Sequence, residues 1–91
     1  RPPMPSTTPM ASLLAGIGFV LAGLAHFVKP ELFQSITATA FPQDTDKHLK
    51  VNGSIETALG VGLIVPQTRK VAAVGVLGYV LYLAANVARN R

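Results

Sequence analysis

The chain has 91 residues, of which 49% are hydrophobic and only 13% are charged, whereas soluble domains carry about 25% charged residues. Its net charge of +4 comes from basic residues that flank apolar segments, without a basic patch between aromatic residues, and this excludes a nucleic-acid surface. The sequence contains no cysteine, which excludes disulfides and Cys-ligated metal sites, and the two histidines lack the spacing of a metal site. We therefore expect an all-α integral membrane protein.

Residues 1–9 contain four prolines and predict an extended arm, and the sequence leaves open whether Arg1 is the original amino terminus. Residues 10–28 carry no Lys, Arg, Asp or Glu and approach the roughly 20 residues with which a helix crosses a membrane. The same segment could be the core of a signal peptide that is cleaved after Ala38-Thr39-Ala40. Its length exceeds the usual core of about 7 to 15 residues, so a transmembrane span is favoured.

Lys29-Pro30 ends the first span, because proline lacks a helix donor and restricts the residue before it. Residues 31–40 are too short and polar to cross a membrane, but Leu32, Phe33 and Ile36 fall on one helical face. This pattern predicts a short interfacial helix between the first and second spans. The polar residues 43–50 are expected in water or among lipid headgroups.

Two further apolar segments predict a second span over residues 51–65 and a third over residues 71–88. Pro66 and the short loop 67–70 predict that the third helix returns antiparallel to the second. We therefore expect one domain, residues 10–91, that forms a helical bundle with three transmembrane helices. The Lys and Arg count differs little between the two sides and leaves the orientation open.

Small residues recur in the first two spans and predict helix packing, because they allow neighbouring backbones to approach closely. The alternative is the ordinary Gly and Ala content of a membrane helix. The predicted packing positions are Gly16, Gly18, Ala22, Ser54, Ala58 and Gly62.

Glu56 lies within the second predicted span, where an acidic side chain costs roughly 3 kcal/mol on insertion scales. Counting the helical rise from each span end places His26, Glu56 and Asn86 within roughly 5 to 10 Å of the same membrane face, with Tyr82 one turn deeper than Asn86. These residues could form a proton-handling or headgroup site that contacts a lipid or a quinone. Alternatively, they satisfy one another and join the helices. No activated nucleophile, paired carboxylate or phosphate loop indicates catalysis.

Two motifs resemble the DoxX-like family of small bacterial membrane proteins, namely Gly23-x-x-His26-Phe27-x-x-Pro30-x-x-Phe33 and Gly53-x-x-Glu56-x-x-x-Gly60-x-Gly62-Leu63-x-x-Pro66-x-x-Arg69. The resemblance implies a four-helix membrane bundle with His26, Pro30, Glu56, Pro66 and Arg69 as characteristic residues. It also implies Pro-Ala-Asn near the end of the third helix, where this chain has Ala84-Ala85-Asn86, and a fourth helix that this chain lacks. Some proteins of that family are associated with quinone-linked oxidoreduction and others with assembly.

From these observations we expect a non-catalytic accessory subunit of a larger bacterial inner-membrane complex, either a transporter, such as a lipid transporter, or a respiratory assembly. The expected partners are other membrane subunits and lipids, with homo-oligomerisation left open and no cofactor beyond a lipid or quinone contact. The alternative is a membrane subunit of a quinone-linked oxidoreductase that uses His26 and Glu56 near one membrane face.

Overall fold

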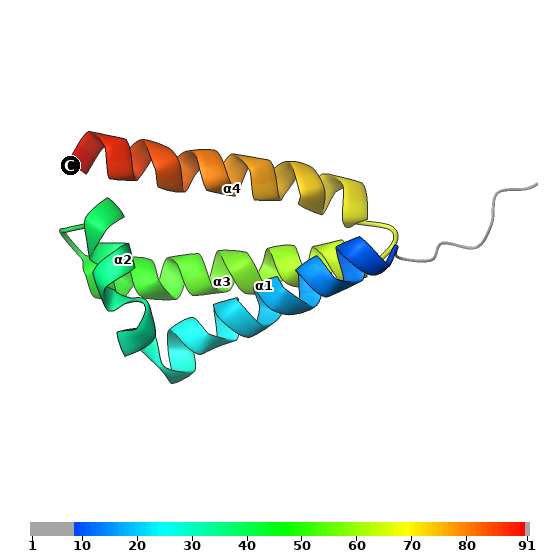
Figure 1. Ribbon diagram of the computed structural model, residues 1–91, viewed down its shortest axis with the longest axis horizontal. Coiled ribbons are helices and arrows are strands. Elements are labelled where there is room, and N and C mark those ends of the chain that lie inside the picture. The colour runs from blue at the N-terminus through cyan, green and yellow to red at the C-terminus, as the bar shows by residue number, and fades with distance from the viewer. Residues whose placement is uncertain (1–8, 91) are drawn as a thin grey trace, which may run out of the picture.

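The computed structural model describes residues 9–90, and these residues form helices without any strand (Figure 1). The all-α prediction is therefore confirmed. The predicted extended arm covers residues 1–9. Residues 1–8 lie outside the described part of the chain, so Pro9 is the part of the arm that the structure describes. The elements are α1 (Met10–Val28), a 3₁₀ turn η1 (Pro30–Leu32), α2 (Gln34–Ala40), α3 (Thr45–Ile64) and α4 (Arg69–Asn90).

The first predicted span and α1 share the same bounds, because a charge-free run lies between Pro9 and the Lys29-Pro30 pair. The predicted interfacial helix is divided into η1 and α2. Pro30 opens the 3₁₀ turn, and Phe33 separates the turn from α2. Leu32 and Ile36 remain exposed, so these short elements keep an apolar outer surface.

Helices α3 and α4 both extend beyond the apolar segments that predicted them. Helix α3 begins at Thr45, where the hydroxyl donates a hydrogen bond to the Phe41 carbonyl at 2.6 Å. The preceding Asp44 has a φ of 57°, a left-handed conformation that Asp tolerates better than most residues. Asp46 then lies in the first turn, where the helix dipole favours negative charge. The apolar pattern of residues 51–65 covers only the later part of α3, whereas the polar first turns are helical as well.

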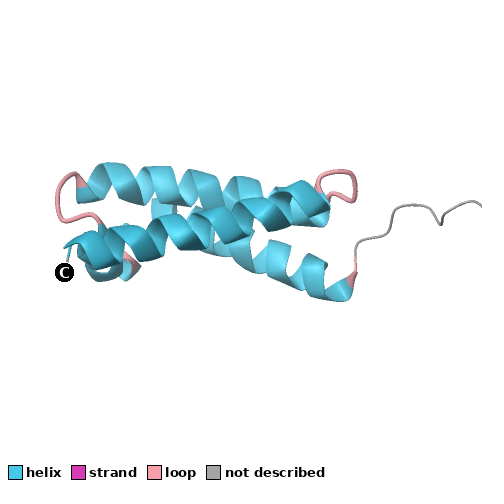
Figure 2. Cartoon of the chain, turned by 90° about the horizontal axis from the view of Figure 1, so that it is seen from above, coloured by secondary structure: helices cyan, strands magenta, loops and turns pink. Residues whose placement is uncertain are grey.

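Helix α3 is the central element, with α1 packed along one side and α4 along another, while α2 contacts α3 and α4 at one end (Figures 1 and 2). Helices α1 and α4 make few contacts with each other. The amino end of α1 and the α3–α4 loop lie at the opposite end from α2 (Figure 1). The three long helices therefore form an open arrangement joined through α3.

Four glycines lie where the backbones of α1 and α3 approach closely. A Cβ at Gly16 would lie 2.7 Å from the carbonyl oxygen of Gly60, and a Cβ at Gly23 would lie 2.7 Å from that of Gly53. These distances are shorter than real Cβ contacts, so only glycine permits this approach of the two backbones. We call these four residues the glycine seam.

The predicted packing positions are distributed over several surfaces. Gly16 belongs to the seam, and a Cβ at Gly62 would meet Ala72 of α4 at 2.8 Å. Gly18, Ser54 and Ala58 are exposed, whereas Ala22 is half-buried. The sequence predicts packing through small residues four apart, whereas the residues of the seam are seven apart on each helix, the repeat with which packed helices keep one face together.

Helices α1 and α4 are long and apolar enough to cross a membrane. Only 17% of the most apolar stretch of each is buried within the protein, unlike a core helix of a soluble protein. Helix α3 is not among these candidate membrane spans. It carries the charged residues Asp46, Lys47, Lys50 and Glu56. Two candidate spans are thus present in the described residues, and the predicted third span remains a prediction.

Candidate functional site

Glu56 is the point at which side chains from three helices meet. The Tyr79 hydroxyl of α4 donates a hydrogen bond to Oε2 of Glu56. The Nε2 atom of His26, near the end of α1, lies 3.8 Å from the same oxygen. The Glu56 side chain is 14% exposed and that of His26 is 5% exposed. A carboxyl group within α3 thus connects α1 to α4, although these two helices scarcely touch.

The orientation of His26 is fixed by its backbone and by an aromatic neighbour. Its Nδ1 atom lies 2.7 Å from the Ala22 carbonyl oxygen, which only accepts hydrogen bonds, so Nδ1 carries the proton. In the neutral imidazole, Nε2 is then an acceptor. The Phe33 ring stacks on the imidazole with a centroid distance of 3.9 Å and an interplanar angle of 12°. The turn after α1 therefore directs Nε2 toward Glu56.

Asn52 lies one turn before Glu56 on α3 and is 3% exposed. Its Oδ1 atom has no hydrogen-bond partner among the residues that the structure describes. An unpaired buried polar atom costs roughly 1 to 3 kcal/mol. Sequence reasoning assigned no site role to Asn52, although its spacing of four from Glu56 placed both on one helical face.

A cavity of about 280 Å³ adjoins these polar groups. His26, Asn52, Glu56 and Tyr79 lie at its polar side, and Thr37 of α2 contributes a further hydroxyl-bearing side chain. The remaining wall is apolar and consists of Phe33, Ile36, Ala40, Phe41, Leu83 and Val87. We refer to this space as the Asn52 cavity.

Glu56 also borders a separate shallow groove of about 350 Å³ along α1. Its other lining residues are Ala15, Gly18, Phe19 and Ala22. A Cβ at Gly18 would meet nothing within 4 Å, so the groove is open at this point. We refer to it as the Gly18 groove.

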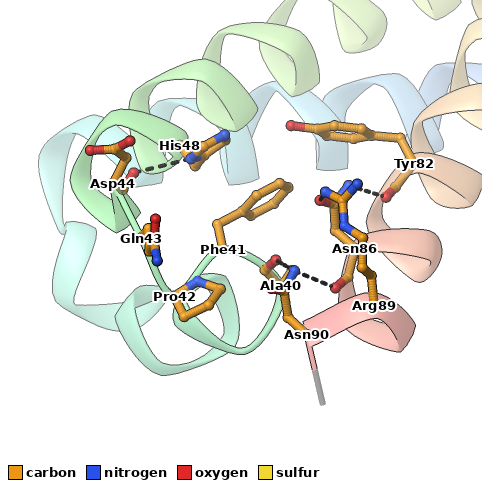
Figure 3. A pocket seen from close by; sticks show the side chains of 10 residues that line it. All are labelled: Ala40, Phe41, Pro42, Gln43, Asp44, His48, Tyr82, Asn86, Arg89 and Asn90. Carbon is orange, nitrogen blue, oxygen red and sulfur yellow. Dashed lines mark hydrogen bonds between the residues drawn. The ribbon is translucent and has the colours of Figure 1, made fainter.

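The remaining members of the predicted cluster, Tyr82 and Asn86, lie elsewhere. They line a polar pocket of about 660 Å³ between α4 and the α2–α3 connection (Figure 3). Asn86 donates to the Tyr82 carbonyl at 2.8 Å and accepts a hydrogen bond from Arg89 at 2.8 Å. The centroid of the Tyr82 ring lies 5.4 Å from the centroid of the Phe41 ring. The structure thus brings His26 and Glu56 together but separates them from this pair.

Tyr79 supplies the hydroxyl that the sequence analysis sought from Tyr82. The two residues are three apart, so their directions around the helix differ by about 60°. A sequence signal for Tyr79 existed, because Ala72, Tyr79 and Asn86 are seven apart and are the buried residues of α4. Tyr79, seven residues before Asn86, is the α4 residue level with Glu56, and rotation about the helix axis decides that Tyr79 and not Tyr82 reaches the carboxyl group.

Within residues 9–90, no group of three or more His, Asp or Glu side chains is arranged to hold a metal ion.

Comparison with known protein families gives a match for most of the chain. Residues 14–91 match the family described as Domain of unknown function (DUF8561). Neither the curated proteins nor the solved structures include a match. The resemblance to the DoxX-like family therefore stays a sequence-based prediction.

Proposed function

The chain belongs to the DUF8561 family, and we propose that it is a non-catalytic accessory subunit of a larger bacterial inner-membrane complex. The observation that carries this proposal is the position of Glu56 in the Gly18 groove. A partially exposed carboxyl group lies there beside apolar and small side chains. Lipid tails offer it no hydrogen bond, so a helix of another subunit is the favoured cover.

In this proposal α1, α3 and α4 all cross the membrane. The helices have 19, 20 and 22 residues, which correspond to about 30 Å each at a rise of 1.5 Å per residue. Asp46, Lys47 and Lys50 lie in the first turns of α3, where charged groups reach the headgroups. Glu56 is then the charged residue of α3 that remains within the hydrocarbon.

This topology is tested by introducing single cysteines into the naturally cysteine-free chain. Gln43→Cys and Gln67→Cys flank α3 in two exposed loops. A membrane-impermeant maleimide should label them from opposite sides of sealed vesicles. Labelling of both from the same side would contradict a membrane-spanning α3.

The groove has the shape that a packed helix requires. Gly18 leaves an open position at its centre, and small residues allow close approach of a second helix. A polar side chain on that helix would pair with Glu56, whose contacts on this chain come from Tyr79 and His26. The partner subunit would thereby complete the environment of the carboxyl group.

The decisive variant is Gly18→Leu, because a Cβ at Gly18 meets nothing within 4 Å and the larger side chain would occupy the groove. The tagged protein would be purified from its native membrane in mild detergent and its companions quantified by mass spectrometry. We expect the wild type to retain a stoichiometric membrane partner and Gly18→Leu to lose it. Gly78→Leu is the matched control, because a Cβ at Gly78 also meets nothing and Gly78 lies outside the groove. A wild-type protein that is recovered as a free monomer, or only with copies of itself, would refute the accessory role.

A second candidate is a membrane subunit of a quinone-linked oxidoreductase. It is favoured by the Asn52 cavity, where apolar walls lead to His26 and Glu56, whose acceptor atoms suit the hydroxyl groups of a quinone headgroup in its reduced form. In this case Glu56→Gln should abolish quinone-dependent turnover of the purified complex while its subunit composition stays intact. Unchanged turnover would exclude this candidate.

A further inference from the structure

The polar side of the Asn52 cavity presents hydrogen-bond acceptors. The Oδ1 atom of Asn52 is buried and has no donor within the described chain. The Nδ1 proton of His26 is engaged by the Ala22 carbonyl, and the Tyr79 hydroxyl is engaged by Glu56. The donors of these two side chains are thus directed away from Asn52. The hydroxyl of Thr37 and the amide nitrogen of Asn52 can also donate here, but neither pairs with Oδ1 of Asn52, so a ligand that brings a donor would satisfy this acceptor.

The rest of the cavity wall is apolar, and it determines which apolar group of a ligand can bind there. Phe33 and Phe41 offer aromatic surface, and Leu83 and Val87 of α4 offer aliphatic surface. The volume of about 280 Å³ is nearly twice that of the engineered cavity of about 150 Å³ that binds benzene. One substituted aromatic ring fits this space. Ile36, another wall residue, is exposed, so a tail attached to the ring could leave along it toward lipid.

We propose that the Asn52 cavity binds the hydroxyl-bearing head of an apolar molecule, with a phenol-type ring as the best fit. The hydroxyl donates to Oδ1 of Asn52, and the ring packs between the aromatic and aliphatic walls. A carbonyl or ether oxygen at the same place would face an acceptor and leave Oδ1 unpaired. The site therefore selects for a donor, and it does not depend on the partner helix that we propose for the Gly18 groove.

The direct test compares two probes that differ only in that donor, 4-octylphenol and 4-octylanisole. The tagged protein, purified with any companion subunit, would be placed in lipid nanodiscs, and displacement of tritiated 4-octylphenol would be followed by scintillation proximity. The phenol should bind saturably, and the methyl ether should bind at least about tenfold more weakly, because a buried hydrogen bond is lost. Equal affinities, or the absence of saturable binding, would overturn the proposal.

Two substitutions test whether Asn52 causes the preference for the phenol over the methyl ether. Asn52→Leu keeps a similar volume without the acceptor, so it should bind both probes equally. Ser54→Ala, on the exposed side of the same helix, should retain the preference for the phenol. A preference that persists in Asn52→Leu would overturn the role of Asn52. Should this variant fail to fold, the probe comparison on the wild type still decides whether the cavity selects a donor.

The Gly18→Leu variant separates this inference from the accessory role. It alters the groove, whereas Gly18 does not line the Asn52 cavity. Retained phenol binding in a protein that has lost its partner supports a cavity that acts independently. A wild-type protein that retains its partner but does not bind the phenol overturns the cavity proposal alone.

Discussion

Replacement of Gly60 by alanine tests a close backbone contact between α1 and α3. The new Cβ would lie 2.5 Å from the carbonyl oxygen of Gly16 and 2.6 Å from the backbone nitrogen of Val20. Both are backbone atoms of α1 and cannot rotate away, so the two helices must separate by most of an ångström. Overpacking of this kind costs about 1 to 3 kcal/mol.

Gly18→Ala is the matched control, because the same methyl group on α1 meets nothing within 4 Å. Both changes gain about 1 kcal/mol of intrinsic helix propensity, so their difference isolates the contact. We expect Gly60→Ala to have a free energy of unfolding about 1 to 3 kcal/mol below that of Gly18→Ala. The assay is reversible unfolding of the full chain in mixed micelles with increasing sodium dodecyl sulfate, followed by far-ultraviolet circular dichroism. Equal stabilities would refute the close approach of α1 and α3 at the glycine seam.

Three further changes test single interactions by the same kind of comparison. Tyr79→Phe removes the hydrogen bond to Glu56 and should lower the free energy of unfolding by about 1 kcal/mol, whereas Tyr82→Phe, whose hydroxyl has no partner in residues 9–90, should leave it unchanged. Equal losses would contradict the assignment of the bond to Tyr79. Ser12→Ala removes the 2.8 Å bond to a carbonyl of α3 and should cost about 0.6 kcal/mol in the unfolding assay; an unaltered midpoint would argue against that bond. Leu81 is 61% exposed on α4, and Leu81→Arg should raise the free energy of membrane insertion by about 3 kcal/mol in a glycosylation-mapping assay, whereas an unchanged inserted fraction would show that α4 does not face lipid.

The positions of the helices were largely determined by local sequence. A charge-free run followed by Lys29-Pro30 was sufficient to define α1, because proline and desolvated charge act within a few residues. The same signals located the apolar part of α3 and α4. They did not locate the start of α3, since Asp44 and the polar first turn are stabilised by capping geometry and not by hydrophobicity.

Only the tertiary structure shows which residues form the site. Rise per residue is constant, so the sequence could place His26 and Glu56 at similar depth, and the structure brings them to 3.8 Å. Rotation about each helix axis is set by packing between helices, here by the glycine seam of α1 and α3 and by the buried positions of α4. That rotation directs Tyr79 toward Glu56, turns Tyr82 toward Phe41 and buries Asn52 beside the cavity. The sequence by itself thus determined where the helices lie along the chain, whereas only the packed structure decided which of their polar groups meet.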